Sequence, residues 1–189
     1  MSIANIPRFG SLAPVRQQRS PARDFVVVGL ALLATALAQT TAAAYLPPNW
    51  ARPDLVLMVA LAWAYLRGGG EGFLAGVIGG LLLDLSSSVP FGLHVLAYGL
   101  ALWLVGNENG PFAASAPRRV AGGVIAAALV HGLVLVVMQL RGWDVWWSAA
   151  LFRSLLPALA LDAVTLVAFY ALLRRLPAPA PEPSGLGSD

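Results

Sequence analysis

Apolar and polar stretches alternate along the chain in a pattern that predicts membrane-spanning helices. The run from Phe25 to Leu46 is long enough to cross a hydrocarbon core of about 30 Å at about 1.5 Å per residue, and Pro47 and Pro48 end it. Five further apolar segments follow: Leu55 to Leu66, Gly72 to Leu85, Gly92 to Val105, Val120 to Leu140 and Trp147 to Leu173. The pattern therefore predicts about six transmembrane helices, several of them short.

Polar, proline-containing stretches flank the apolar region on both sides and set the expected domain organisation. Residues 1–24 carry several arginines and prolines, so we expect a disordered basic cytoplasmic tail there. Residues 176–189 are rich in proline and of low complexity, which is typical of a second disordered tail on the cytoplasmic side. Between them, residues 25–175 are expected to form a single transmembrane helical domain.

Composition supports a multi-pass membrane protein and narrows the possible chemistry. The chain is 58% hydrophobic and 11% charged, with a mean hydropathy of +0.74, and little of it is left for a separate soluble catalytic domain. There is no cysteine, which excludes disulfides, thiolate nucleophiles and thiolate metal sites. The pI of about 10.0 comes from arginines spread over several loops without interleaved aromatic residues, so we expect no nucleic-acid partner.

The distribution of arginines predicts the orientation of the chain in the membrane. With the N-terminus in the cytoplasm, only Arg52 and Arg141 fall in outer loops, while the inner segments hold most of the other arginines. We therefore expect both termini to be cytoplasmic. The charge pattern leaves one alternative open, because residues 54–85 would give the same later orientations if they formed a re-entrant hairpin.

The first apolar run has a second interpretation, as a secretory signal peptide. Basic residues precede it, and Ala42, Ala43 and Ala44 resemble a cleavage site of the A-x-A type. The polar leader is long and the apolar run continues past a usual signal core, so we interpret this segment as the first transmembrane helix.

Glycines spaced four apart form a stripe along the third apolar segment. Gly72, Gly76 and Gly80 share one helix face, and small residues at this spacing allow the backbones of two helices to approach closely in lipid. The stripe predicts close helix packing. Packing inside the bundle and contact with a partner protein are both compatible with it.

Two ionisable residues near the outer face invite a functional interpretation. Asp84 ends the glycine stripe and His94 begins the next span, so the two side chains can pair. They would form either a proton or substrate site or a set of hydrogen bonds that fixes the turn around Ser86, Ser87 and Ser88. We favour the second interpretation, since a carboxylate near the interface costs far less than one at mid-bilayer.

Other ionisable residues lie within the last two spans. We expect His131 to make one interhelical hydrogen bond rather than to bind a ligand. Arg153 and Asp162 lie on roughly opposite helix faces at about 100° per residue, so they are not expected to pair. Arg153 follows an aromatic cluster and can reach the interface, whereas Asp162 is the better candidate for a buried interhelical contact.

Motifs of known catalytic sites are absent from the sequence. There is no G-x-S-x-G nucleophile elbow, no H-E-x-x-H zinc helix and no G-x-x-x-x-G-K-[ST] phosphate loop. A small-molecule site should bring several polar or aromatic groups together, and Asp84, His94 and Trp103 are the obvious material. We therefore expect neither an enzyme nor a bound cofactor or metal.

The order of features over residues 52–105 resembles the conserved block of the rod shape-determining protein MreD family. The resemblance is carried by Arg52-Pro53-Asp54-Leu55, by the glycine stripe leading through Leu81-Leu82-Leu83 to Asp84, and by Pro90-Phe91-Gly92-Leu93-His94 followed by Tyr98. Chain length and the six predicted spans also fit. The three serines at 86–88 depart mildly from the family pattern and leave the conformation of that turn open.

This resemblance implies a non-enzymatic scaffold subunit of the bacterial cell-elongation complex in the inner membrane. It implies a fold similar to the substrate-binding component of energy-coupling-factor transporters. The implied partners are an MreC-like protein and, indirectly, MreB and the RodA and penicillin-binding protein pair that makes peptidoglycan. In that role the glycine stripe would allow close packing, and the outer turns would be fixed by Pro53, Asp54, Asp84, Gly92 and His94. The alternative is a vitamin-like substrate-binding component of a transporter.

Overall fold

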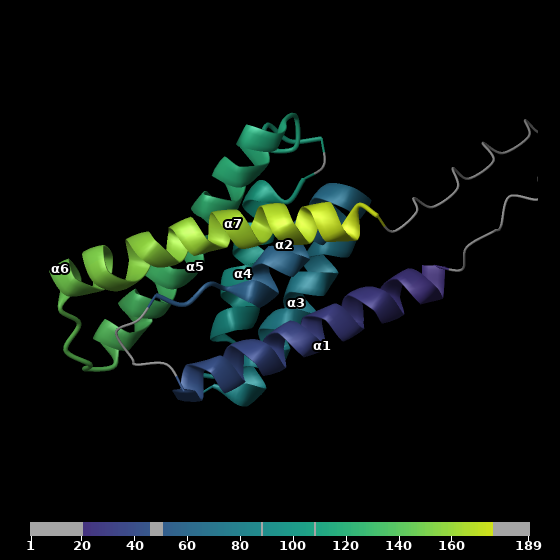
Figure 1. The fold of residues 1–189 in the computed structure, drawn as a ribbon. Coiled ribbons are helices and arrows are strands. Elements are labelled where there is room, and N and C mark those ends of the chain that lie inside the picture. Colours follow the sequence, from purple (N-terminus) through teal and green to yellow (C-terminus); the bar gives the residue numbers. More distant parts are fainter. Residues whose placement is uncertain (1–20, 46–50, 88, 108, 176–189) are drawn as a thin grey trace, which may run out of the picture.

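The computed structural model describes residues 21–45, 51–87, 89–107 and 109–175, and their regular structure is entirely helical. Because α6, η1 and α7 are continuous, the elements make six helical segments, as the apolar pattern predicts (Figure 1). The elements are α1 (Pro21–Tyr45), α2 (Leu55–Arg67), α3 (Gly69–Ser86), α4 (Leu93–Val105), α5 (Ala116–Leu140), α6 (Trp147–Ala149), the π-helix η1 (Ala150–Leu155) and α7 (Leu156–Leu173).

Four of the six segments in the described part of the chain are long and apolar enough to cross a membrane. They are Arg23–Ala42, Gly69–Ser86, Ala116–Leu140 and Trp147–Leu173, whereas α2 and α4 are shorter. The fold class is thus that of an all-α membrane protein.

The first helix begins at Pro21 rather than at Phe25, so residues 21–24 belong to the helical domain and not to the N-terminal tail. Proline is favoured in the first turn of a helix because a backbone N–H at that position would have no hydrogen-bond partner within the helix, so nothing is lost by its absence. Asp24 in the same turn pairs with Arg67 at 2.9 Å, which fixes the start of α1 against the end of α2. The expected tails over 1–20 and 176–189 lie outside the described residues.

Helix α2 forms the centre of the bundle. Every residue from Val56 to Tyr65 is buried, and the helix packs against α1, α3, α4, α5 and α7 (Figure 1). Its sequence is apolar on all sides, as expected for a helix surrounded by other helices. The other segments therefore share one core, which α2 occupies.

Contacts at both ends of α2 show how it lies relative to α1. Its last residue, Arg67, reaches Asp24 in the first turn of α1, and the backbone N–H of Val56 in its first turn donates to Oε1 of Gln39 at 3.3 Å. Opposite ends of α2 thus lie beside opposite parts of α1. Gly68, with φ of 114°, makes the sharp turn into α3.

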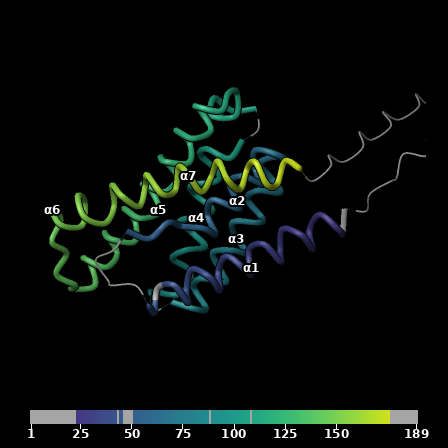
Figure 2. The backbone as a smooth tube through the Cα atoms, in the orientation of Figure 1, coloured from purple at the N-terminus to yellow at the C-terminus, as the bar shows by residue number. Residues whose placement is uncertain are grey.

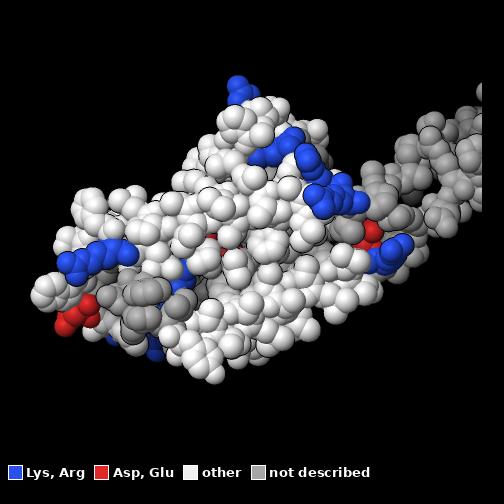
Figure 3. Space-filling model, viewed as in Figure 1, with Lys and Arg blue, Asp and Glu red and all other residues white. Residues whose placement is uncertain are grey.

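Charged side chains gather at the two ends of the bundle and leave an apolar band between them (Figure 3). The first turn of α1 and the last turn of α7 lie at the same end (Figure 2). We call this the arginine end, after Arg23, Arg67, Arg118, Arg119, Arg174 and Arg175. The tryptophan end is the opposite one, where Trp143, Trp146 and Trp147 precede η1 and are exposed.

The last helical segment departs from regular α geometry at η1, which the sequence analysis did not predict. The widened turns end at Leu155, just before Pro157 in the first turn of α7. Proline has no N–H to donate to the carbonyl one turn earlier, and its ring excludes that carbonyl. A local widening of the helix accommodates this clash, and such π-turns occur frequently at functional sites.

Candidate functional site

A network of polar side chains runs through the interior of the bundle from the start of α2. This helix begins inside the protein, so its first backbone N–H groups need partners other than water. Oδ1 of Asp54, the N-cap residue, accepts from the N–H of Leu57 at 3.1 Å. The N–H of Val56 donates to Gln39 on α1, and the N–H of Asp54 itself donates to Oδ1 of Asp162 on α7 at 2.6 Å. Asp54 itself and side chains from two other helices, α1 and α7, thus cap the start of α2.

Two further helices join this network through Asp54 and Asp162. The hydroxyl of Tyr98 on α4 donates to Oδ1 of Asp54, which also receives Nε2 of Gln39 at 3.5 Å. Oδ2 of Asp162 lies 3.2 Å from Nε2 of His131 on α5. Asp54 is 3% exposed and Asp162 is 0% exposed, so both carboxylates depend on these partners for stabilisation.

Asp84 caps the start of the other short helix, α4, from the end of α3. Its Oδ2 accepts from the N–H of Gly92 at 2.9 Å and of Val95 at 3.2 Å. Its Oδ1 accepts from the N–H of His94 at 3.0 Å and lies 2.8 Å from Nδ1 of the same residue. A negative charge at a helix N-terminus is also favoured by the helix dipole. Asp84 therefore holds the turn between α3 and α4 through three backbone N–H groups.

The two capping groups are neighbours in the structure. The rings of His94 and Tyr98 meet edge to face, with centroids 6.0 Å apart. A line of polar side chains consequently runs from Asp84 through these rings to Asp54 and on to Asp162, and it ends at His131. It ties together α3, α4, α2, α7 and α5.

The chemistry available to this network is structural. Each of the three buried carboxylates accepts at least one backbone N–H together with a side-chain donor, which leaves none of them as an open base facing a cavity. In the described part of the chain, no three histidine, aspartate or glutamate side chains cluster in a way that would hold a metal ion. The arrangement satisfies buried helix ends rather than presenting reactive groups.

The glycine stripe faces the inside of the bundle. A Cβ on Gly72 would overlap Ala64 of α2, and one on Gly76 would overlap the side chain of Leu102 on α4. A Cβ on Gly80 would lie 2.8 Å from the backbone Cα of Val95, closer than packed atoms allow. The stripe is therefore covered by the protein's own helices. This placement favours packing inside the bundle as the role of the stripe.

The other residues that the sequence pattern pointed to do not share one site. Pro53 precedes the N-cap residue of α2 and lines a cavity at the tryptophan end. Gly92 adopts a φ of +92°, a conformation that favours glycine, and this lets its N–H reach Asp84. Trp103 is 73% exposed and lines a separate cavity with Gly69 and Gly70, so it does not converge with Asp84 and His94.

Sequence reasoning missed the partners that complete the network. Gln39 and Tyr98 carry no charge and attracted no functional interpretation, yet both bond to Asp54. The link between Asp54 and Asp162 joins residues 108 positions apart. A polar side chain within an otherwise apolar span is a sequence feature that indicates a buried hydrogen bond. Gln39 has this feature, as the charged residues do.

Comparison with known proteins identifies one family. The family model described as rod shape-determining protein MreD matches residues 22–177, which is most of the chain. No curated protein and no solved structure matches the chain. The expected likeness to the substrate-binding component of energy-coupling-factor transporters thus stays a prediction.

Proposed function

The chain belongs to the rod shape-determining protein MreD family, and from this premise we propose that it is a non-enzymatic scaffold of the bacterial cell-elongation complex. Family membership makes it a cell-shape protein of the rod complex, and its four long apolar helices suit an integral membrane protein. In this proposal it binds the transmembrane part of an MreC-like protein. Through that protein it acts on MreB and on the RodA and penicillin-binding protein pair, and so organises peptidoglycan synthesis.

The buried polar network supports a scaffold rather than a catalyst. It joins side chains of α1, α2, α4, α5 and α7, and the pair of Asp84 and His94 adds the end of α3. Polar groups that are fully hydrogen-bonded inside a protein make its arrangement specific, because other arrangements leave them unpaired. A bundle fixed in this way presents the same outer surface to each partner, which is what an organising subunit requires.

The charge distribution supports an orientation with both termini in the cytoplasm. The arginine end contains the start of α1 and the end of α7, and basic residues are enriched on the cytoplasmic side of membrane proteins. The exposed tryptophans at the opposite end suit the outer interface. We therefore place the arginine end in the cytoplasm and the tryptophan end at the outer face of the inner membrane.

The transporter-component alternative is not supported by the family match, which concerns cell shape. Asp84, His94 and Trp103, the three residues considered for a vitamin-like ligand, do not form one cavity.

The test is co-purification with an MreC-like protein combined with site-directed photo-crosslinking. Leucines on the lipid-facing sides of α1 and α4 are exposed and suit the crosslinker, namely Leu30, Leu37, Leu96 and Leu100. We expect the partner to co-purify and crosslinks to concentrate on one helix face. A buried position such as Leu61 serves as the control that should not crosslink. Failure to co-purify with a folded chain, or equal crosslinking at all exposed positions, would contradict the proposal.

A further inference from the structure

Two cavities at the tryptophan end share Arg52 and His131. One has a volume of about 240 Å³ and lies between the second half of α5 and the start of the last helical segment. The other has a volume of about 410 Å³ and lies beside α1 and the end of α3. We call the first of these, together with Arg52 at its edge, the Arg52 cleft. Of its lining residues, the sequence pattern pointed to His131 as an interhelical hydrogen-bond partner and to Arg52 as an outer-loop arginine, and to no ligand site formed by the two.

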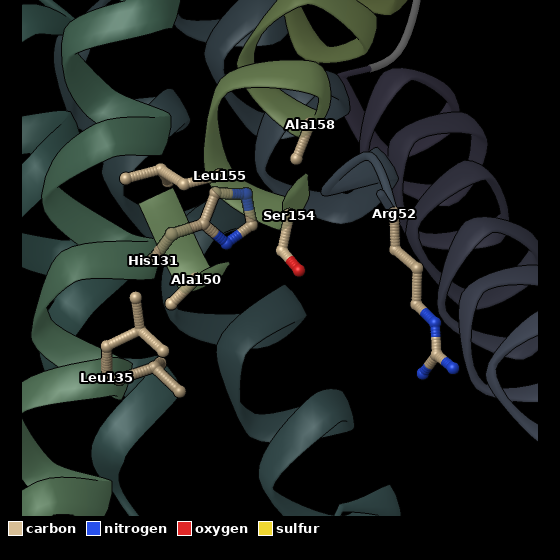
Figure 4. A pocket seen from close by; sticks show the side chains of 8 residues that line it. Arg52, His131, Leu135, Ala150, Ser154, Leu155 and Ala158 are labelled. Carbon is tan, nitrogen blue, oxygen red and sulfur yellow. The ribbon is translucent and has the colours of Figure 1, made fainter. Parts of the chain in front are cut away.

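The polar side of the Arg52 cleft carries donors suited to an anion. Figure 4 shows Ser154 between His131 and Arg52, with its hydroxyl pointing into the space between them. The ring of His131 bonds Asp162 through Nε2, and its second nitrogen faces the same space. An imidazolium would donate from both nitrogens, so Asp162 on one side and an anion on the other would stabilise the same protonated form.

The surroundings argue against a cation as the occupant. Neither cavity is lined by a carboxylate, because the buried Asp54, Asp84 and Asp162 face the network inside. The guanidinium of Arg52 is permanently charged and matches the geometry of phosphate oxygens. The cleft thus brings a guanidinium and the hydroxyl of Ser154 to walls on which no carboxylate is found among the described residues.

The wall of the cleft across from Arg52 is largely apolar, with Leu135 and Leu155 on either side of His131 (Figure 4), which points to an amphiphile rather than a free anion. Val134, Leu135, Leu155 and Ala158 form this wall. Leu156, the next residue along the last helical segment, is 52% exposed, so apolar surface continues outward from the cleft. A ligand with a charged group at Arg52 and a hydrocarbon part along this wall would satisfy both sides.

The π-helix η1 contributes to the shape of the cleft. It supplies Ala150, Ser154 and Leu155 to the lining, and all three side chains are seen around the cavity in Figure 4. A π-turn shifts the side chains after it around the helix axis relative to a regular helix. Pro157 explains why the helix widens here, and the widening sets which side chains face His131.

We propose that the Arg52 cleft binds the phosphate-bearing headgroup of an anionic lipid from the leaflet at the tryptophan end. The phosphate lies among Arg52, His131 and Ser154, and the first part of an acyl chain lies along the apolar wall. The volume of the cleft suits a headgroup and not a whole lipid, so most of the hydrocarbon stays in the bilayer. This site is independent of the scaffold role and would exist in either orientation of the chain.

Native mass spectrometry of the full chain in detergent, titrated with phosphatidylglycerol, tests the proposal. We expect phosphatidylglycerol to bind about tenfold or more tightly than phosphatidylcholine, and Arg52→Gln to weaken it by about tenfold or more, since a charge-assisted contact is lost. Arg141→Gln is the matched control, because Arg141 is an exposed arginine at the end of α5 and does not line the cleft. It should leave binding unchanged.

A second variant and a second probe separate the possible outcomes. Ser154→Leu removes the hydroxyl, fills the cleft and keeps the segment apolar, so it should fold and should also reduce binding of phosphatidylglycerol. Equal binding of the two lipids, equal effects of Arg52→Gln and Arg141→Gln, or unchanged binding by Ser154→Leu would overturn the proposal. Inorganic phosphate that binds in an Arg52-dependent way while the lipid does not would assign the cleft to a free anion instead, which also overturns it.

Discussion

The two carboxylates that cap α2 and α4 from other segments should respond very differently to the same isosteric change to asparagine. Asp84 receives backbone N–H groups on both oxygens, from His94 on one and from Gly92 and Val95 on the other. Asp162 receives one backbone N–H on one oxygen and His131 on the other. An asparagine has one acceptor oxygen and one NH2 group, so only one oxygen of each carboxylate can be replaced as an acceptor.

Asp84→Asn cannot satisfy its surroundings in either orientation. With the amide oxygen toward Gly92 and Val95, the NH2 group faces the backbone N–H of His94, and the reverse orientation sets it against two N–H groups. A buried N–H group left without an acceptor costs about 1–3 kcal/mol. The two hydrogen bonds that remain are no longer made to a charged oxygen, so each weakens by about 1 kcal/mol. We expect Asp84→Asn to lower the free energy of unfolding by about 3–5 kcal/mol.

Asp162→Asn can adopt one amide orientation in which every buried N–H group around it keeps an acceptor. Its amide oxygen accepts from the N–H of Asp54, and its NH2 group donates to Nε2 of His131 once the ring proton moves to Nδ1. Both bonds lose their charge assistance, so the expected cost is about 2 kcal/mol. Asp162→Leu removes both oxygens, so the N–H of Asp54 and the ring of His131 lose their hydrogen-bond partner. We expect this substitution to lower the free energy of unfolding by about 2–5 kcal/mol.

Unfolding by a denaturing detergent, followed by tryptophan fluorescence, measures these free energies in the purified protein. The chain has six tryptophans, and Trp63 is buried in α2, so loss of the bundle changes its environment. Asp144→Asn is the control, because Asp144 lies exposed between α5 and α6. A cost for Asp162→Asn equal to or above that of Asp84→Asn would refute the assignment of hydrogen bonds to the two sites.

Three other substitutions test the packing and the network with the same unfolding measurement. Gly80→Ala should lower the free energy of unfolding by about 2 kcal/mol or more, because the new methyl group would lie 2.8 Å from the backbone of Val95. Gly132→Ala in α5 meets open space, so the higher helix propensity of alanine should raise the free energy of unfolding by about 0.5–1 kcal/mol. Equal effects of the two glycine changes would contradict this packing. Tyr98→Phe removes the hydroxyl that donates to Asp54 and should cost about 1–2 kcal/mol, and a neutral result would mean that the bond contributes nothing to stability.

The sequence predicted the helical segments well because their apolar character is local information. The segment expected over Leu55 to Leu66 is α2, and the one expected over Trp147 to Leu173 is the continuous run of α6, η1 and α7. Helix starts were less well placed. Val120 was expected to begin the fifth span, but α5 begins at Ala116 with Pro117 in its first turn, because polar residues can occupy a first helical turn outside the lipid.

The candidate site was less predictable because its geometry depends on which helices meet. Asp84 and His94 are close in sequence, so their pairing could be anticipated from the chain alone. The contacts of Asp54 with Tyr98 and of its N–H with Asp162 join distant segments, and no local pattern encodes them. The cleft at Arg52 likewise requires α5 and η1 to lie beside the start of α2.

The shortness of α2 and α4 gives the polar network its physical reason. A helix that spans the hydrocarbon core leaves its unpaired N–H groups in the polar interface, where water and lipid headgroups satisfy them. Helices of 13 residues, as α2 and α4 both are, extend only about 20 Å, and the start of α2 is buried while that of α4 is partly buried. Their N-termini must then be capped by protein. Asp54, Asp84 and Asp162 supply those acceptors, so acids that stand out in an apolar sequence serve here to cap two short helices within the bundle.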